Sequence, residues 1–297
     1  MLGVVNLDKP VGPTSHDMVG MMRRLTGTRR IGHAGTLDPL ASGVLPILVG
    51  AATRFSAELT GGSKRYDAVI RLGACSATDD AQGPIEPVDG PVPDEDAVRT
   101  ALAGFVGTFD QLPPAFSARK LGGRTAHRAA RAGDPISLPP RSVTIHALDM
   151  LAFDIAEDGI DVRVDLRCGA GTYVRSLARD LGERLGTGGY LGALRRTEAA
   201  GLAVDASFTP ERLEALATAG RLGDAILPVG ELLSLPHVVL DPDAALAFRN
   251  GSARQLVGVL ATDGRAAVFD GGELIGIGSV SSNRLQPEKV LPREPAG

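Results

Sequence analysis

Residues 32–43 have the sequence GHAGTLDPLASG, in which one carboxylate, Asp38, follows His33 by five positions among several glycines. Pro39 disfavours the helical region for the residue before it, which keeps Asp38 extended. The glycines allow another part of the backbone to approach closely. An aspartate in such a loop is most often a turn former. The local sequence therefore leaves two interpretations open, an ordinary turn and a functional carboxylate in a tight loop.

The segments around this loop predict strands and helices in turn. Residues 4–7 and 44–48 are short apolar runs typical of strands, and residues 66–72 alternate so that one face is apolar. Residues 51–59 are predicted to be helical. Residues 98–105 carry an apolar stripe at helical spacing.

Two further segments have clear periodicity. Thr14 and Asp17 have capping-box spacing ahead of a helical stripe of apolar residues. Residues 160–168 alternate strictly, with charged side chains on the outer face. Thr172 is then predicted to cap a helix that has Arg175 in its first turn, where a cation opposes the helix dipole.

The helix after Thr172 carries a second cation, Arg179, four residues beyond Arg175. Like charges at this spacing disfavour an isolated helix by about 0.2–0.5 kcal/mol. Cations in such positions suggest an anionic partner. The alternative is a surface arginine paired with Asp180 or Glu183.

Composition indicates an ordinary globular protein. Of 297 residues, 43% are apolar and 22% charged, and the two cysteines form no CxxC or Cys/His cluster, which argues against a disulfide framework or a structural zinc. No apolar run is long enough for a membrane span, and no signal peptide is apparent. We expect a cytoplasmic protein without membrane contacts.

The net charge of −4 hides an uneven distribution. Lys and Arg exceed Asp and Glu by nine to five in residues 1–75, by six to one in 112–147 and by seven to three in 163–197. Acidic residues concentrate in 77–100. Basic surfaces can bind a polyanion despite a negative total, although charge alone favours ordinary solvated faces.

The composition and the hydrophobic pattern change at two places along the chain. Residues 107–142 are rich in Pro, Gly and Arg, which is typical of an exposed insertion. From residue 236, short apolar runs separated by turn signals, with one helix at 242–249, predict a small β domain. We expect a larger domain at 1–235, the small domain at 236–291 and a disordered tail at 292–297.

The loop at 32–43 resembles the catalytic motif of the TruB family of pseudouridine synthases, whose pattern is close to G-H-x-G-x-L-D-P-x-A-x-G. This sequence matches it at every fixed position. The resemblance continues, in the same order, through NLDKP at 6–10, KRY at 64–66, GTYVRSL at 171–177 and LRR at 194–196.

This resemblance implies a fold and a reaction. The fold is α+β, a mixed, largely antiparallel sheet flanked by helices, followed by a small β-barrel similar to PUA domains. The reaction isomerises the uridine at position 55 in the TΨC loop of tRNA by breaking the N1–C1′ bond, turning the base and joining C5 to C1′. No redox change occurs, so we expect no cofactor.

By the same resemblance, Asp38 is the catalytic carboxylate, and Arg175 is the cation that keeps it ionised. A carboxylate can attack C1′ or take a ribose proton, and the sequence leaves both routes open. Tyr66 is implied to stack on the target base and to assist proton transfer at C5. Without the family pattern, Tyr66 would be a core aromatic.

The remaining implied contacts are to RNA. His33 matches the residue that occupies the space of the flipped nucleotide, and a base inside a folded loop must be extruded before it can react. The other candidate substrate-binding residues are Tyr173, Leu194, Lys64, Arg65 and Lys120. Lys120 lies in the basic insertion at 107–142, which resembles a thumb-like element over the T-arm. His127 departs from the family there, which usually has an aromatic residue.

The expected partner is the T-arm of tRNA, bound by a monomer that needs no protein partner. Two rival functions are a tRNA-binding chaperone in which catalysis is dispensable, and a pseudouridine synthase for another RNA. A guided enzyme of the second kind would normally need partner proteins, so activity of the single chain on a T-arm minihelix distinguishes them.

Overall fold

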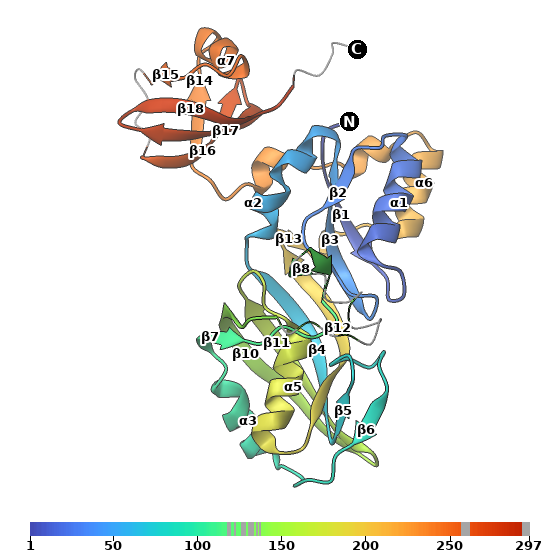
Figure 1. The fold of residues 1–297 in the computed structure, drawn as a ribbon. Helices are drawn as coiled ribbons and strands as arrows, with labels where there is room; N and C mark the ends of the chain where they lie inside the picture. The colour runs from blue at the N-terminus through green and yellow to red at the C-terminus, as the bar shows by residue number, and fades with distance from the viewer. Residues whose placement is uncertain are drawn as a thin grey trace.

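A nine-stranded mixed sheet forms the body of the protein in the computed structural model (Figure 1). The structure describes residues 1–117, 120–121, 123–125, 129, 134, 136, 138–256 and 262–292. The main path has the order β1-β3-β12-β4-β11-β10-β7, and β2 and β13 pair at its side. These strands are β1 (Gly3–Lys9), β2 (Ile31–His33), β3 (Ala41–Val49), β4 (Lys64–Leu72), β7 (Gly107–Gln111), β10 (Arg141–Ala156), β11 (Gly159–Cys168), β12 (Gly189–Ala199) and β13 (Leu202–Ala203).

One pairing in this sheet is parallel, between β3 and β12, and the other pairings are antiparallel. The expectation of a mixed, largely antiparallel sheet is therefore confirmed. Segments from the first and last thirds of this body meet at the parallel pair. The loop of residues 32–43, called the Asp38 loop below, leaves β2 and enters β3 beside it.

The larger helices of the body pack on one face of the sheet, whereas the short helix at residues 56–60 packs on the other. Side chains from all four larger helices share one apolar cluster with the inward face of β4, which consists of Tyr66, Ala68, Ile70 and Leu72. On the opposite face, β4 carries charged residues, whereas β1 and β3 carry a second buried apolar cluster. Helical bounds are α1 (Ser15–Thr26), α2 (Ser56–Thr60), α3 (Glu95–Ala103), α5 (Val174–Leu185) and α6 (Pro210–Thr218), with 3-10 turns η1 (Gly50–Phe55), η2 (Val204–Ala206), η3 (Leu222–Ala225) and η4 (Val229–Leu232).

The ends of two helices test the capping predictions. The capping box of α1 is present, because the Thr14 hydroxyl accepts from the Asp17 amide and the Asp17 carboxylate accepts from the Thr14 amide. The prediction for Thr172 is wrong. The N-cap of α5 is Tyr173, and the Thr172 hydroxyl instead donates to the carbonyl of Gly169 at 3.1 Å.

The other predicted helices are confirmed in outline. Residues 51–59, predicted as one helix, are divided between η1 and α2. The helix predicted near residues 98–105 is α3, which begins at Glu95 and ends at Ala103. None of the described helices is long and apolar enough to cross a membrane.

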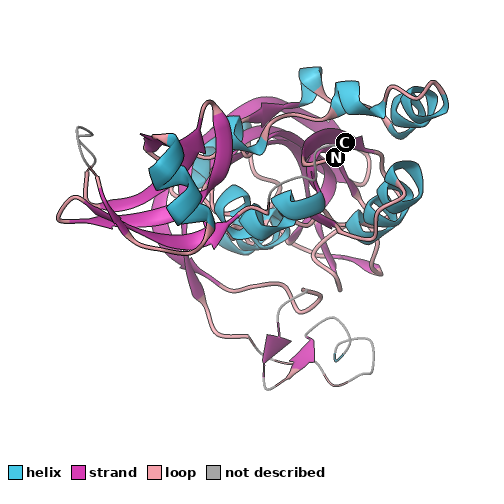
Figure 2. Cartoon of the chain, turned by 90° about the horizontal axis from the view of Figure 1, so that it is seen from above, coloured by secondary structure: helices cyan, strands magenta, loops and turns pink. Residues whose placement is uncertain are grey.

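Two small hairpins project from this body. The hairpin of β5 (Ala74–Ser76) and β6 (Ile85–Pro87) follows β4 directly. The insertion predicted at 107–142 begins and ends inside the main sheet, since β7 and the start of β10 pair with each other. Between them, β8 (Lys120–Leu121) and β9 (Arg124–Thr125) form a hairpin that stands away from the sheet (Figure 2). His127 lies outside the described residues.

A second, five-stranded sheet follows the body, in the region where the sequence predicted a small β domain. Its order is β14-β16-β17-β18-β15, and α7 (Pro242–Arg249) packs against it (Figure 1). The strands are β14 (His237–Leu240), β15 (Arg254–Gln255), β16 (Gly264–Asp270), β17 (Glu273–Ser281) and β18 (Arg284–Val290). Most of the predicted tail, residues 293–297, lies outside the described residues.

Candidate active site

The Asp38 loop is fixed by contacts on both sides of the aspartate. The buried hydroxyl of Ser15, at the start of α1, accepts from the Leu37 amide at 2.9 Å and donates to the Leu37 carbonyl at 3.0 Å. On the other side, the Pro39 carbonyl accepts from the Gly12 amide at 2.8 Å. These hydrogen bonds hold the backbone immediately before and after Asp38.

Arg196 of β12 holds the glycine-rich part of the same loop. Its guanidinium is buried and donates to the carbonyls of Val44 at 2.7 Å, Gly35 at 3.0 Å and Thr36 at 3.4 Å. Hydrogen bonds from a charged donor are worth about 1.5–3 kcal/mol each. The loop therefore has a defined backbone position, which a catalytic carboxylate requires.

Asp38 forms an ion pair with Arg175. The Nε atom of Arg175 lies 3.0 Å from Oδ2 of Asp38, and the arginine side chain is 7% exposed while the aspartate is 40% exposed. Other nitrogens of Arg175 donate to the carbonyls of Thr78 at 3.1 Å and Phe116 at 2.9 Å. The cation is thus buried and oriented, while the carboxylate remains open to a ligand.

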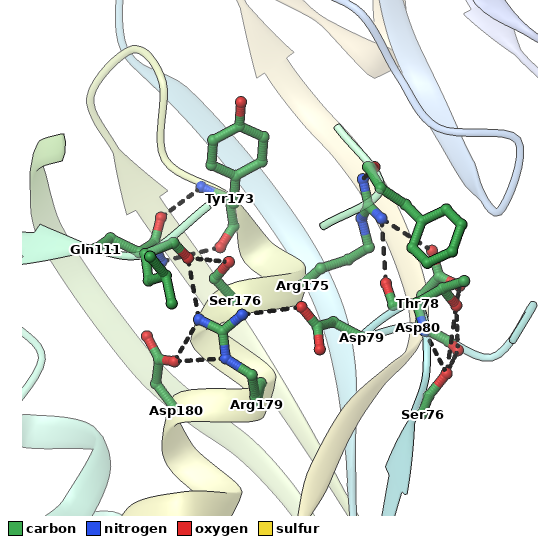
Figure 3. Close-up of polar contacts among 12 residues, drawn as sticks. Ser76, Thr78, Asp79, Asp80, Gln111, Tyr173, Arg175, Ser176, Arg179 and Asp180 are labelled. Atoms are coloured by element: carbon green, nitrogen blue, oxygen red, sulfur yellow. Dashed lines mark hydrogen bonds and ion pairs between the residues drawn. The ribbon is translucent and has the colours of Figure 1, made fainter. Parts of the chain in front are cut away.

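Asp80 is a second carboxylate beside Arg175. Its Oδ2 atom lies 3.7 Å from Nη1 of Arg175, and its side chain is 5% exposed. Oδ1 of Asp80 accepts from the Thr78 hydroxyl and from the Gln82 amide. Figure 3 shows that Arg175 points toward the turn that carries Thr78 and Asp80. Asp80 therefore provides a second carboxylate within 4 Å of the buried guanidinium.

A pocket of about 350 Å³ opens over Asp38 and Arg175. It collects six of the nine site residues predicted from sequence, from four separate parts of the chain. These six are Asp38, Lys64, Tyr66, Tyr173, Arg175 and Leu194. Its volume is at the small end of the range for sites that take one small molecule or one extruded group.

The two predicted aromatic groups near the loop are held in their neutral forms. Burial raises the pKa of the Tyr66 phenol, with the charge of Arg196 opposing the change. Burial likewise lowers the pKa of His33. The His33 Nδ1 atom is buried and has no hydrogen-bond partner in the described part of the chain. A neutral phenol can donate a proton, and a neutral imidazole suits a stacking role.

Lys64 is a buried cation at the edge of the pocket. Its ammonium donates to the carbonyls of Thr60 and Gly62, both at 2.8 Å. Burial, followed by the charge of Arg196, lowers its pKa to about 8. Lys64 is therefore tied to the end of α2 and contributes part of the positive charge around the pocket.

Three predicted site residues lie outside the pocket lining. The Arg65 guanidinium pairs with Asp165 at 2.7 Å and with Glu198 at 3.3 Å on the outer face of the sheet, so it is already neutralised within the protein. His33 lies on β2, before the Asp38 loop reaches the pocket. Lys120 lies on β8 of the insertion.

The idea that Arg179 faces an anionic ligand is not supported by its contacts. Its guanidinium pairs with Asp79 at 3.0 Å and Asp180 at 2.8 Å (Figure 3), and also with Glu183 at 3.8 Å. Three carboxylates satisfy this cation. Arg179 is therefore a structural residue that joins α5 to the turn at Asp79.

Sequence reasoning missed three residues that organise this site, namely Ser15, Asp80 and Arg196. Arg196 was noted only as part of a family motif. Asp80 lies in a turn, where no hydrophobic periodicity indicates a contact. Ser15 has the position of an ordinary first residue of a helix. Ser15 and Arg196 contact loop residues up to 22 and 161 positions away, and Asp80 contacts Arg175 from a distant turn, so only the fold brings these residues together.

Comparisons with known proteins agree with this geometry. Residues 23–174 match the TruB family pseudouridylate synthase N-terminal domain, and residues 175–234 match the tRNA pseudouridylate synthase B C-terminal domain. The first match includes the whole Asp38 loop and ends one residue before Arg175.

Curated relatives and solved structures extend the likeness over the whole chain. The tRNA pseudouridine synthase B of Dechloromonas aromatica (strain RCB) is 43% identical, covering 97% of this chain and 95% of its own. That of Arthrobacter sp. (strain FB24) is 48% identical, covering 71% and 70%. A chain in the structure of an H/ACA ribonucleoprotein bound to a substrate RNA containing 2′-deoxyuridine has a TM-score of 0.73 and 26% identity, covering 98% of this chain and 86% of its own.

Proposed function

The chain belongs to the TruB family of pseudouridylate synthases, and we propose that it isomerises the uridine at position 55 of the tRNA TΨC loop with Asp38 as the essential carboxylate. The observation that carries the residue assignment is the Asp38–Arg175 ion pair at the floor of the pocket. The buried arginine places a positive charge beside the carboxylate, which is 40% exposed and so stays open to the ribose.

The pocket residues have complementary tasks in this reaction. Asp38 either attacks C1′ or removes a ribose proton while the N1–C1′ bond breaks, because a carboxylate can do both. Tyr66 stacks on the uracil. Once C5 is bonded to C1′, the C5 proton must leave and N1 must gain one, and the Tyr66 hydroxyl can relay this proton because it gives up its own as it accepts another. Tyr173 and Leu194 enclose the extruded base from the other walls.

The other candidate residues, apart from those that act on the uridine, bind the RNA through positive charge or stacking. We assign His33 to the space left by the flipped nucleotide, consistent with its neutral imidazole. Lys64 and Lys120 contribute positive charge for phosphates, at the pocket edge and in the insertion. Arg65 contacts phosphate less directly, because two carboxylates already hold it.

We further propose that the single chain acts as a monomer without protein partners, and that the second sheet is a PUA-like RNA-binding domain. Several similar solved structures are multi-component H/ACA assemblies. The relatives that are named tRNA pseudouridine synthase B match this chain over nearly all of its length.

The first test of function is mass spectrometry of an unmodified T-arm after incubation with the purified chain, with cyanoethylation to mark pseudouridine. We expect pseudouridine at position 55 without added cofactor or protein. Tight RNA binding without any product would instead favour a chaperone function.

The first test of the site is Asp38→Asn. We expect product formation to fall by about 10³-fold or more, while the dissociation constant for tRNA stays close to that of the wild type, because the side-chain shape is kept. Asp158→Asn, which alters an exposed carboxylate paired with Arg71, serves as the control and should retain full activity. Full activity of Asp38→Asn would refute the assignment.

A further inference from the structure

Gln111 is a buried amide whose two polar atoms both bind the backbone of one distant residue. It is the last residue of β7 and is 1% exposed. Its Oε1 atom accepts from the Tyr173 amide at 2.9 Å, and its Nε2 atom donates to the Tyr173 carbonyl at 3.0 Å (Figure 3). The Gln111 side chain thus holds both the amide and the carbonyl of Tyr173.

Tyr173 is the N-cap of α5, where the position of the helix is set. Its own side chain makes no capping hydrogen bond to the described residues, and its carbonyl accepts the first helical bond, from Leu177, at 3.1 Å. Helices usually obtain a cap from a side chain at the N-cap itself. Here an amide from β7, 62 residues earlier, holds that position instead.

The first turn of α5 carries Arg175, so a displacement of Tyr173 is passed to the ion pair. Arg175 is two residues beyond Tyr173, and its Nε atom is 3.0 Å from Asp38. Hydrogen-bonded ion pairs depend steeply on distance and angle. A misplacement of about 1 Å in a catalytic group can cost about 10²-fold in rate.

The start of α5 also contacts residues 112–117, which form the first part of the insertion after β7. The Leu112 carbonyl accepts from the Ser176 hydroxyl at 2.8 Å and from Arg179 at 3.0 Å. The Phe116 carbonyl accepts from Arg175 at 2.9 Å. The start of α5 therefore holds both the catalytic cation and the segment that leads to the β8–β9 hairpin.

We propose that Gln111 is a positioning residue for this enzyme: it places Arg175 against Asp38 through the Tyr173 backbone. This inference rests on the proposed function. Gln111 does not line the pocket, so it acts through Tyr173 and not on the substrate. Its effect should therefore fall on turnover and leave tRNA affinity intact.

The first test is Gln111→Met, which keeps the approximate side-chain volume and removes both hydrogen bonds. We expect the single-turnover rate on a T-arm RNA to fall by about 10- to 100-fold, with a dissociation constant within about twofold of the wild type. Thr108→Val is the matched control. Thr108 lies on β7 with Gln111, and the change removes its hydroxyl contact with Thr144 of β10 without touching α5. A wild-type rate in Gln111→Met would overturn the proposal.

A second variant, Gln111→Glu, makes the test specific. A protonated glutamic acid reproduces the amide pattern, with one oxygen accepting from the Tyr173 amide and the O–H donating to its carbonyl. The ionised form cannot donate and repels that carbonyl. We expect the ratio of Gln111→Glu to wild-type rate to rise as the pH is lowered, while the ratio for Gln111→Met stays flat. A flat ratio for both variants would contradict the positioning role.

A readout without catalysis separates this inference from the function on which it rests. With ¹⁵N-labelled arginine, the Nε–H signal of Arg175, assigned by its loss in Arg175→Lys, should exchange slowly with solvent in the wild type. It should exchange faster in Gln111→Met and remain slow in Thr108→Val. An unchanged signal in Gln111→Met overturns the positioning role, whereas absence of pseudouridine from the wild type overturns the proposed function.

Discussion

Lys64 has an unusual environment for a lysine, because its ammonium is buried between backbone carbonyls and next to another cation. Thr60 and Gly62 supply the two carbonyls. Burial, with the charge of Arg196, lowers the pKa of Lys64 from 10.5 to about 8. This difference corresponds to roughly 3 kcal/mol of cost for the charged form in the folded protein. A cost of this size at the pocket edge supports a role in substrate binding.

The pKa of Lys64 leads to a prediction about stability. Between pH 8 and 10.5 the unfolded chain keeps the Lys64 proton while the folded protein loses it, so the free energy of unfolding gains a rising contribution with pH. Lys9, whose pKa burial also lowers to about 8, contributes in the same way. Lys64→Met should therefore show a shallower rise than the wild type in urea unfolding measured from pH 7 to 10.5. Parallel curves for the two proteins would contradict the buried charge.

At the scale of single residues, the sequence predicted which residue types suit the proposed reaction better than it predicted which side chains contact one another. Asp38, Tyr66 and Arg175 were assigned by a motif whose residue types follow from the reaction, and the fold brings them into one pocket. Arg65 and Arg179 have the same residue type as Arg175, yet nearby carboxylates neutralise them. Arg175 differs from them because one of its carboxylate partners, Asp38, lines the pocket. Asp38 comes from a distant part of the chain, so no local pattern encodes this pairing.

At the scale of elements, the parallel pairing of β3 with β12 decides how the Asp38 loop is held. Gly43 of β3 stands opposite Arg196 of β12, and a Cβ atom on Gly43 would lie 2.2 Å from the Arg196 carbonyl oxygen. This close approach carries the Arg196 side chain to the carbonyls of the loop. The individual strands could be predicted from alternation, but a parallel contact between residues 153 positions apart could not.

The close approach predicts a large effect for Gly43→Ala. The φ angle of Gly43 is +99°, which costs an L-residue about 1–2 kcal/mol, and the clash with backbone adds a cost of overpacking of about 1–3 kcal/mol. We expect the free energy of unfolding to fall by about 3 kcal/mol or more. We also expect lower activity, since Arg196 would move with its strand.

Gly107→Ala separates the cost of backbone strain from the cost of the Cβ clash. Gly107 has a similar φ of +119°, but a Cβ atom there would meet nothing within 4 Å. Backbone strain alone should lower its free energy of unfolding by about 1–2 kcal/mol. Equal losses in Gly43→Ala and Gly107→Ala, measured by urea denaturation, would show that the β3–β12 contact is looser than the structure has it.

At the scale of the whole molecule, the second sheet shares an apolar cluster with the body, and one carboxylate adds ion pairs between them. Glu58 of α2 is 8% exposed and pairs with Arg265 of β16 at 2.6 Å and Lys289 of β18 at 2.8 Å. Lys289 also donates to the Arg54 carbonyl, and Arg54 donates to the carbonyl of Val290. The sequence predicted a separate β domain after residue 236, but no pattern in it indicated this contact, because its members lie more than 200 residues apart.

The Glu58 contacts reach the pocket through α2. This short helix ends at Thr60, whose carbonyl accepts from Lys64. Burial tends to raise the pKa of Glu58, but the hydrogen bonds from Lys289 and Arg265 outweigh it and hold the pKa below its usual value. The stabilisation is therefore present at neutral pH and is lost as the pH falls through the normal carboxyl range toward the lower folded value. Acid should weaken the attachment of the second sheet.

Glu58→Gln should reproduce at neutral pH what acid does to the wild type. Loss of two charge-assisted contacts should weaken the attachment by about 2–3 kcal/mol, so that calorimetry at pH 7 shows an earlier, separate transition and proteolysis in residues 233–236 becomes faster. Turnover should fall modestly, because the end of α2 is less firmly held. Glu288→Gln, which loses a contact with Arg265 inside the second sheet but none with α2, is the control and should unfold as the wild type does. If Glu58→Gln and Glu288→Gln behave alike, the second sheet is held by its apolar contacts, and the link from Glu58 to the pocket must be abandoned.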